Sequence, residues 1–536
     1  MLSYRKLAMR VLGHPLHTGG GIDSPRPASQ RAAAFILTAA MLITLAAPAF
    51  ADIWHIENGD ITISAGESGN NVTQNNNTTY GDTNTIITNQ NKDTASSHTV
   101  TIEAKDKDDK VEVTLKDVNI DTSSRNKAAV SVTGEGDTNI KLDGDNALKS
   151  DIYRSGIYGS GSLTISGGEN DSLTAQGGSG ANGISSSGSL TISGGTVTAN
   201  GDDGGRGISS SGRVTISGGS TVTANGGSGT ISGGDGIWSG GGVTISGGST
   251  VTANGGNGGS LVGGDGIRSG GGLTVSDGTV TAKGGNGDSK DGYGGDGIRS
   301  GGVVTISGNT VNAAGGYGGK VGGYGICSFD RVAISGGTVE AAGGNGSTGG
   351  GSGIYSSVID LSGSLELTAK AGSPNGKALS QKGSELVLDT IKDKLGPGAK
   401  VTATDADGKV IDQVSTPRPV EPEESSSSSD GGSAAPSAPA SPLPGLTVTD
   451  KDGQRISYTS TQSGNTLTVC VGRLTASFRI SLAALRQLRA EGIETITFQT
   501  ILCSTTLSVD ELLAMGGEDA EAVLTHRFTD SSLTVG

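Results

Sequence analysis

The sequence predicts an all-β fold: a right-handed parallel β-helix (solenoid) of three-stranded rungs, followed by a linker and a small α+β domain. A glycine-rich unit repeats eight times between residues 157 and 383, and the distance between equivalent isoleucines is 24 to 31 residues. Each unit alternates polar and apolar residues over short segments, and none has an apolar stripe at the helical period of 3.6 residues. Aromatic residues make up only 3% of the chain. A core of stacked Ile, Val and Leu needs few of them.

The first 51 residues have the features of an export signal. Basic residues between 5 and 31 precede an apolar run over 32–47, and Ala49-Phe50-Ala51 matches the small-x-small pattern of a cleavage site. The run is shorter than the ~20 residues that a membrane-spanning helix needs. We therefore expect cleavage before Asp52, a secreted or cell-surface protein, and no transmembrane segment after cleavage.

Residues 52–414 are expected to form the solenoid, because segments such as 60–64, 84–88, 98–104, 110–120, 128–132 and 138–142 alternate at period two before the regular rungs begin. Each regular rung contains G-I-x-S, L/V-T-I-S and T-V-T-A segments. Glycine pairs between them predict corners at positive φ. The anchor isoleucines of the rungs are Ile157, Ile184, Ile208, Ile237, Ile267, Ile298, Ile326 and Ile354.

Stacking the rungs at roughly 4.8 Å pairs each backbone with its neighbours. In one rung we expect Ile237, Val243, Ile245, Val251 and Ala253 to point inward. The handedness of parallel crossovers favours a right-handed coil. Unit length varies after T-V-T-A, which predicts a surface loop at that corner. Residues 357–414 degrade the pattern. Segment 378–391 still resembles a rung, and the tail after it, with Pro397 and the charged run DADGK (405–409), is expected to cap the open end of the coil.

Composition changes over residues 415–445, where seven prolines accompany EPEE and SSSSSDGG, and this predicts a disordered linker. Residues 446–536 are expected to form a small α+β accessory domain. Its helix begins after the N-cap Ser481 and stops at Gly492. In an exported protein Cys470 and Cys503 could pair, whereas Cys327 is alone in the repeat and is expected to be inert.

The net charge of -15, without a Lys/Arg cluster after residue 51, argues against nucleic acid as a partner. The position after each anchor isoleucine should point outward, and three consecutive rungs place Trp238, Arg268 and Arg299 there. Aromatic faces stack on sugar rings, and arginine donates to hydroxyls or carboxylates. Tyr355 in the same column and Tyr324 in a neighbouring loop could extend this surface. Alternatively, Trp238 only packs against a neighbouring arginine.

Two residues before the anchor isoleucine, three consecutive rungs carry Asp235, Asp265 and Asp296. Carboxylates stacked at rung spacing repel each other by roughly 1 kcal/mol per pair in water. Ca²⁺ could offset this repulsion, since it prefers carboxylate and carbonyl oxygens. The alternatives are Arg268 and Arg299, or exposure to solvent. The sequence establishes no cofactor, and Ca²⁺ at the three aspartates is the one candidate.

The segments VTLKDVNI (113–120) and LDGDNAL (142–148), together with the LTISGG/TVTA unit, resemble a family of bacterial carbohydrate-binding domains. These domains are right-handed parallel β-helices, similar in shape to pectate lyases. The resemblance covers roughly residues 100–390. It implies an extracellular protein that binds polysaccharide and sometimes calcium, but it transfers no ligand set to particular residues.

The expected function is therefore polysaccharide binding without catalysis. The chain contains no G-x-S-x-G or H-E-x-x-H motif, and no paired carboxylates suggest a hydrolase. Two alternatives remain: a calcium-dependent lyase of the pectate type, in which Arg268 or Arg299 acts beside the aspartates, and a structural or adhesive surface spacer.

Overall fold

The computed structural model describes residues 52–417 and most of 445–535, with gaps at 451–454, 457, 464, 472–474, 501–503, 516–519 and 527–530. The chain divides into two compact units, Met1–Pro422 and Glu423–Gly536. The predicted export signal and residues 418–444 of the predicted linker lie outside the described residues. Within the described part of the chain, no helix is both long and apolar enough to cross a bilayer.

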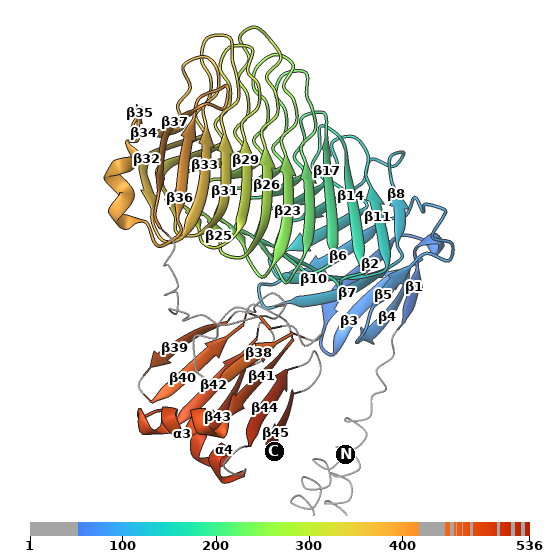
Figure 1. The fold of residues 1–536 in the computed structure, drawn as a ribbon. Coiled ribbons are helices and arrows are strands. Elements are labelled where there is room, and N and C mark those ends of the chain that lie inside the picture. The colour runs from blue at the N-terminus through green and yellow to red at the C-terminus, as the bar shows by residue number, and fades with distance from the viewer. Residues whose placement is uncertain are drawn as a thin grey trace, which may run out of the picture. The chain divides into compact units, whose positions relative to one another are not determined.

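The first unit is a parallel β-solenoid of about 13 turns, which confirms the predicted all-β fold class (Figure 1). Each regular rung has three short strands in the predicted order, and each strand pairs in parallel with its equivalents in the adjacent rungs. In one rung they are β21 (Ile237–Ser239), β22 (Val243–Ile245) and β23 (Ser249–Asn254). The strands of a rung therefore lie on three faces of the coil.

The first face contains the eight strands that begin at the anchor isoleucines, together with β2 (Ile61–Gly66), β6 (Val100–Ala104), β9 (Val130–Gly134) and β34 (Leu379–Gln381), which pair in the same series. The eight are β12 (Ile157–Gly159), β15 (Ile184–Ser186), β18 (Ile208–Ser210), β21, β24 (Ile267–Ser269), β27 (Ile298–Ser300), β30 (Ile326–Ile334) and β32 (Ile354–Leu361).

The other two faces run beside it, and β30 and β32 continue into the second. That face contains β1 (Ile53–His55), β5 (Ile86–Thr88), β7 (Lys110–Lys116), β10 (Asp137–Asp143), β13 (Ser162–Ser166), β16 (Leu190–Ser193), β19 (Val214–Ser217), β22, β25 (Leu273–Val275) and β28 (Val304–Ile306). The third contains β8 (Asn119–Asp121), β11 (Asp145–Lys149), β14 (Ser172–Ser179), β17 (Thr196–Asp202), β20 (Thr221–Asn225), β23, β26 (Gly278–Lys283), β29 (Thr310–Ala314), β31 (Gly337–Ala342), β33 (Leu365–Lys370) and β36 (Lys400–Thr404).

The core is a set of apolar columns that run along the axis of the coil. Ile157 pairs with Ile184, and the same register continues through every anchor isoleucine to Ile354. All eight are fully buried, and the five residues predicted to point inward in the rung of Ile237 are at most 1% exposed. Full burial of such a side chain contributes roughly 1.5–3 kcal/mol.

A hairpin that was not predicted covers the edge of β2 at the N-terminal end of the coil. Strands β3 (Gly69–Gln74) and β4 (Asn77–Asp82) pair antiparallel, and β3 also pairs antiparallel with β2. Asn75 and Asn76 turn the hairpin with φ of 52° and 64°, as a two-residue type I′ turn requires. Before it, η1 (Ile56–Asn58) follows β1.

The C-terminal end of the coil is closed in a similar way, as predicted. After β35 (Ser384–Glu385) and η2 (Leu388–Lys394), strand β37 (Val410–Ser415) pairs antiparallel with β36. Residues Ser415 and Thr416 were expected to begin the linker but still belong to the coil, because the Thr416 N–H donates to the Ala399 carbonyl at 3.0 Å.

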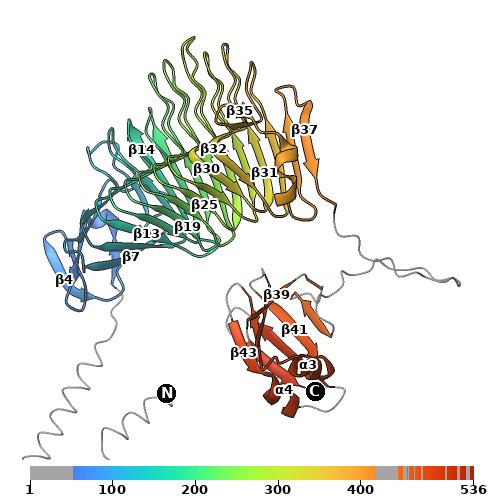
Figure 2. The ribbon, with the colours of Figure 1, turned by 90° about the vertical axis from the view of Figure 1, so that its left-hand side faces the viewer.

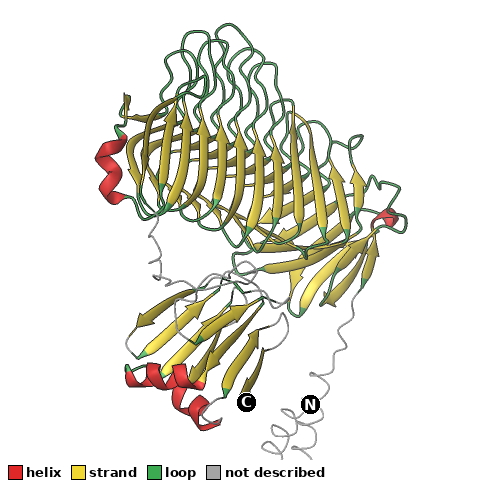
Figure 3. Cartoon of the chain, viewed as in Figure 1, coloured by secondary structure: helices red, strands yellow, loops and turns green. Residues whose placement is uncertain are grey.

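The corner after the third strand is a surface loop, as predicted, and its backbone is hydrogen-bonded into a layer from rung to rung. We call it the glycine crest: residues 226–234, 255–264, 284–295, 315–323 and 343–351. Its loops form a row along one edge of the coil (Figures 1–3). Within a rung the Gly264 N–H donates to the Gly256 carbonyl at 2.8 Å, and between rungs Gly256 donates to Gly234 at 2.8 Å. The same alternation continues from rung to rung, so the two limbs of each loop are held together.

Close backbone approach, and not positive φ, explains the glycines of the crest. A Cβ atom on Gly234 would lie 1.9 Å from the carbonyl oxygen of Gly205. The predicted positive φ does occur at the corners before the third strand, for example at Gly218 (68°) and Gly219 (70°). Glycine is therefore needed for two different reasons: close backbone approach in the crest, and positive φ at the corners before the third strand.

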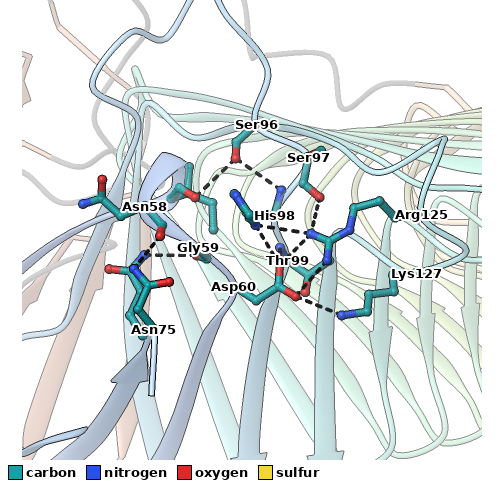
Figure 4. Close-up of polar contacts among 12 residues, drawn as sticks. Asn58, Gly59, Asp60, Asn75, Ser96, Ser97, His98, Thr99, Arg125 and Lys127 are labelled. Carbon is teal, nitrogen blue, oxygen red and sulfur yellow. Dashed lines mark hydrogen bonds and ion pairs between the residues drawn. The ribbon is translucent and has the colours of Figure 1, made fainter. Parts of the chain in front are cut away.

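Asp60 ties the first rung to the loop that precedes β9 (Figure 4). The Arg125 guanidinium donates to both of its carboxylate oxygens at 2.8 and 3.2 Å, and Lys127 Nζ lies 2.9 Å away. The Thr99 N–H donates to it at 3.0 Å, and His98 Nδ1 lies at 3.2 Å. Burial opposes ionisation, but the bonds from Lys127 and Arg125 outweigh it and hold the pKa of Asp60 well below its usual range.

Asp60→Asn is expected to lower the free energy of unfolding by roughly 1–2 kcal/mol at neutral pH, because solvent screens this partly exposed cluster. The pKa of Asp60 is lower in the folded than in the unfolded state. Its stabilisation is therefore present above about pH 4 and is lost as the pH falls further. Urea unfolding at pH 7 and pH 3 should show a smaller difference from wild type at pH 3 than at pH 7, because the loss begins only below about pH 4. Asp143→Asn, at an exposed pair with Lys116, is the control and should cost less.

The second unit has two sheets and two helices among its described residues. One sheet contains β38 (Leu446–Thr449), β41 (Ala476–Ser481), β44 (Glu521–His526) and β45 (Ser531–Val535), and the other contains β39 (Thr459–Ser463), β40 (Thr466–Cys470), β42 (Thr495–Gln499) and β43 (Ser504–Ser508). The helices are α3 (Leu482–Ala490) and α4 (Val509–Met515). Ser481 caps α3 as predicted, accepting from the Ala484 N–H at 3.2 Å. Cys470 is a free thiol, and Cys503 lies outside the described residues.

Candidate functional site

A groove of about 830 Å³ crosses the rungs beside the first face of the solenoid. One side is formed by crest residues such as Gly233, Val262, Gly294 and Val321. The other side consists of residues just before or within the first strands. It includes six of the predicted site residues: Asp235, Asp265, Arg268, Asp296, Arg299 and Tyr324.

The three aspartates form a hydrogen-bonded ladder along the groove. Asp235 Oδ1 accepts the N–H of Asp265 at 2.9 Å, Asp265 Oδ1 accepts that of Asp296 at 2.7 Å, and Asp296 Oδ1 accepts that of Tyr324 at 2.7 Å. Asn182 accepts the N–H of Arg206 in the same way at 2.8 Å. The side-chain oxygen at this position therefore accepts a hydrogen bond from a backbone N–H of the next rung, which would otherwise lack a partner.

Arginines supply the charge that opposes the aspartates. Arg206 Nε donates to Asp235 Oδ2 at 3.2 Å, and Arg299 Nη1 donates to Asp296 Oδ2 at 3.3 Å. Arg268 lies farther from Asp265, at 3.8 Å. Arginine was one of the predicted alternatives to calcium. Among the described residues, no three or more His, Cys, Asp or Glu side chains are grouped to hold a metal, and calcium at the aspartates stays a prediction.

Two members of the ladder, Asp265 and Asp296, are buried strongly enough to disfavour ionisation. The aspartate residues are 4–6% exposed. Burial, together with repulsion from Asp296 and Asp235, raises the pKa of Asp265 to about 8. Burial raises the pKa of Asp296 to about 6, against the opposing effects of its bond from Tyr324 and the charge of Arg299. Asp265 is shifted further, in agreement with its longer distance to arginine.

Trp238 lies on β21 between Ser209 and Arg268 of the adjacent rungs. The guanidinium of Arg206 lies 4.5 Å from the centre of its ring. The alternative in which the tryptophan packs against an arginine therefore occurs, but with Arg206 and not with Arg268. Trp238 adjoins the groove without being one of its lining residues.

At the other end of the groove the Tyr324 and Tyr355 rings are stacked, with centroids 4.9 Å apart and planes inclined by 18°. Arg299 lies over the ring of Phe329 at 5.2 Å. Cys327 is 1% exposed in this part of the coil. Burial raises the pKa of its thiol to about 12, which agrees with the expectation that this cysteine is inert.

Two members of this surface, Arg206 and Phe329, were not among the predicted site residues. Arg206 stands two residues before Ile208, in the same column as the aspartates, and that position could have identified it. Phe329 stands where the preceding rungs have Gly301 and Gly270, so the break in the repeat was a usable signal.

No protein-family model, curated protein or solved structure matches this chain. The resemblance to carbohydrate-binding domains therefore stays an expectation. Each guanidinium has five N–H donors, and the contacts to the aspartates use only part of them. Donors repeated at rung spacing, with aromatic rings nearby, can bind an extended ligand that has hydroxyl or acidic groups and apolar faces.

Proposed function

We propose that the protein is a secreted or cell-surface binder of an extended polysaccharide and has no catalytic role. The observation that carries this proposal is a single groove across the rungs that holds Arg206, Arg268 and Arg299 close to Trp238 and the Tyr324–Tyr355 stack. Sugars offer both apolar ring faces and hydroxyls, so this combination of side chains suits them.

The length of the groove favours a polymer over a single sugar. Four rung steps separate the strands of Ile208 and Ile326, and at ~4.8 Å per step the groove extends about 19 Å. The hydrogen-bonded crest forms one side of it. A rigid wall lowers the entropy cost of ordering the site around its ligand.

Retention of the full chain on insoluble cellulose, pectin and mucin glycans tests the proposal. We expect retention on at least one of them, and we expect Trp238→Ala or Arg268→Gln to lower it at least ~10-fold, since aromatic and arginine side chains dominate such interfaces. Tyr80→Ala is the matched control, because Tyr80 is 77% exposed on β4 and does not line the groove. Retention on none of the three, with or without calcium, would refute the proposal.

The same samples separate the alternatives. A pectate-type lyase would release unsaturated uronates that absorb ultraviolet light, and we expect none from pectin. For a surface spacer, Trp238→Ala would leave retention unchanged.

A further inference from the structure

A second pocket, of about 570 Å³, lies on the first face nearer the N-terminal end of the coil. Its lining includes Lys127, Tyr153, Arg154, Tyr158 and Ser185, none of which belongs to the predicted site. The groove includes Asn182, so the two sites adjoin at one rung.

Tyr158 lies in the same outward column as Trp238. It pairs with Ser131 on one side and Ser185 on the other, and the column continues through Ser209 to Trp238. Three rung steps separate the two aromatic residues, about 14 Å at ~4.8 Å per step. Because both neighbours are serines, Tyr158 stays 43% exposed.

Tyr153 adds a second ring to this pocket. Its φ of 59° is uncommon for a residue other than glycine, and backbone bonds to the next rung hold it there. The Tyr153 N–H donates to the Ser179 carbonyl at 2.9 Å, and the Gly178 N–H donates to the Arg154 carbonyl at 3.0 Å. The ring lies against Gly180, where a Cβ would be 2.9 Å from Cε1, yet the residue is 78% exposed.

The charged residues that line this pocket are all basic. Arg154 donates to Asn126 Oδ1 at 3.4 Å, and no carboxylate of a described residue lies within 4.0 Å of it. Lys127 is held by Asp60 and remains 50% exposed. Neither Asp nor Glu lines the pocket, in contrast to the groove with its three aspartates.

We propose that this pocket is a second subsite, which binds a sugar residue carrying a carboxylate or sulfate on the same polymer that occupies the groove. Tyr153 and Tyr158 would contact the ring, while Arg154 and Lys127 would bind the acidic group. The inference rests on the proposed function of the groove. A chain that fills both sites binds the second one intramolecularly, which raises its affinity.

Calorimetry on the full chain tests the inference with short and long oligogalacturonides, sulfated chondroitin oligosaccharides, and cello-oligosaccharides as the neutral series. In an acidic series we expect one trimer to bind at each of the two sites. We also expect the affinity for a long oligomer to be ~10- to 100-fold higher than the affinity for a trimer. The series that shows this gain distinguishes carboxylate from sulfate.

Variants assign the two sites separately. Tyr158→Ala with Arg154→Gln should remove one trimer site and the length-dependent gain, and Trp238→Ala should remove the other trimer site. Tyr153→Asn is a second variant of the pocket, because asparagine tolerates positive φ. Tyr80→Ala is again the control, and thermal unfolding checks the fold of each variant.

The second subsite would be overturned if the wild type binds only one trimer, and if this binding is lost in Trp238→Ala but kept in both pocket variants. That result would leave the proposed function intact. A trimer that is lost only in the pocket variants would instead contradict the proposed function of the groove. Equal affinity for short and long acidic oligomers would also overturn the inference.

Discussion

Gly264→Ala is expected to lower the free energy of unfolding of the solenoid by on the order of 3–5 kcal/mol. The new Cβ would lie 1.9 Å from the carbonyl oxygen of Gly234. The backbone cannot move away freely, because the Gly264 N–H donates to Gly256 and its carbonyl accepts from Gly285, both at 2.8 Å. Urea unfolding followed by tryptophan fluorescence reports on the coil specifically, since Trp54 and Trp238 are the two tryptophans of the chain.

Two further glycines show whether close approach is the cause. Gly159→Ala should be almost neutral, because the nearest atom to its Cβ is 3.8 Å away and the equivalent residue in the next rung is Ser186. Gly219→Ala should cost about 1 kcal/mol through its φ of 70° alone, since no atom lies within 4 Å. Equal losses in all three variants would contradict the steric explanation.

The pH dependence of stability should change strongly in Asp265→Asn. The pKa of Asp265 is raised to about 8 in the folded coil from an ordinary value of 3.8, so the folded state binds more protons between these values. Its contribution to stability therefore falls as the pH rises from about 4 to about 8. The asparagine variant lacks this loss. It should be more stable than wild type by on the order of 2–4 kcal/mol at pH 9, and close to wild type at pH 4.

Asparagine is suitable because it keeps an oxygen that can accept the Asp296 N–H, as Asn182 does for Arg206. Asp265→Leu is the control. It leaves that N–H buried without a partner and should cost about 1–3 kcal/mol, including at pH 4. The measurement is urea unfolding of wild type and both variants at pH 4, 7 and 9. The same slope in wild type and Asp265→Asn would show that Asp265 is ionised throughout.

Local patterns predicted the fold because every rung repeats the same pattern of buried and exposed side chains. Burial of one side chain per rung, such as Ile237 above Ile267, can be inferred from spacing alone. The glycine crest could not be foreseen, because its cause is the distance between two limbs of a loop and not the conformation of either limb. The β3–β4 hairpin was missed since its partner strand, β2, also fits a parallel rung.

The candidate site was predicted in its position but not in its contacts. Spacing placed Asp235 and Asp265 in one column and Arg268 in another column nearby. The structure brings all three residues into one groove. Which guanidinium reaches which carboxylate depends on side-chain geometry across rungs. Arg206 contacts both Asp235 and Trp238, although it lies one rung before the three rungs that contain the predicted aspartates.

The closing strands at the two ends of the coil determine where its growth stops. Every rung offers the next a row of unpaired N–H and carbonyl groups, and an open end would be a template for another molecule. Strand β3 occupies that edge on β2, and β37 occupies it on β36, both in antiparallel orientation. With these strands in place, no further parallel rung can be added to the first face at the N-terminal end or to the third face at the C-terminal end, so copies of the coil cannot stack on these two edges.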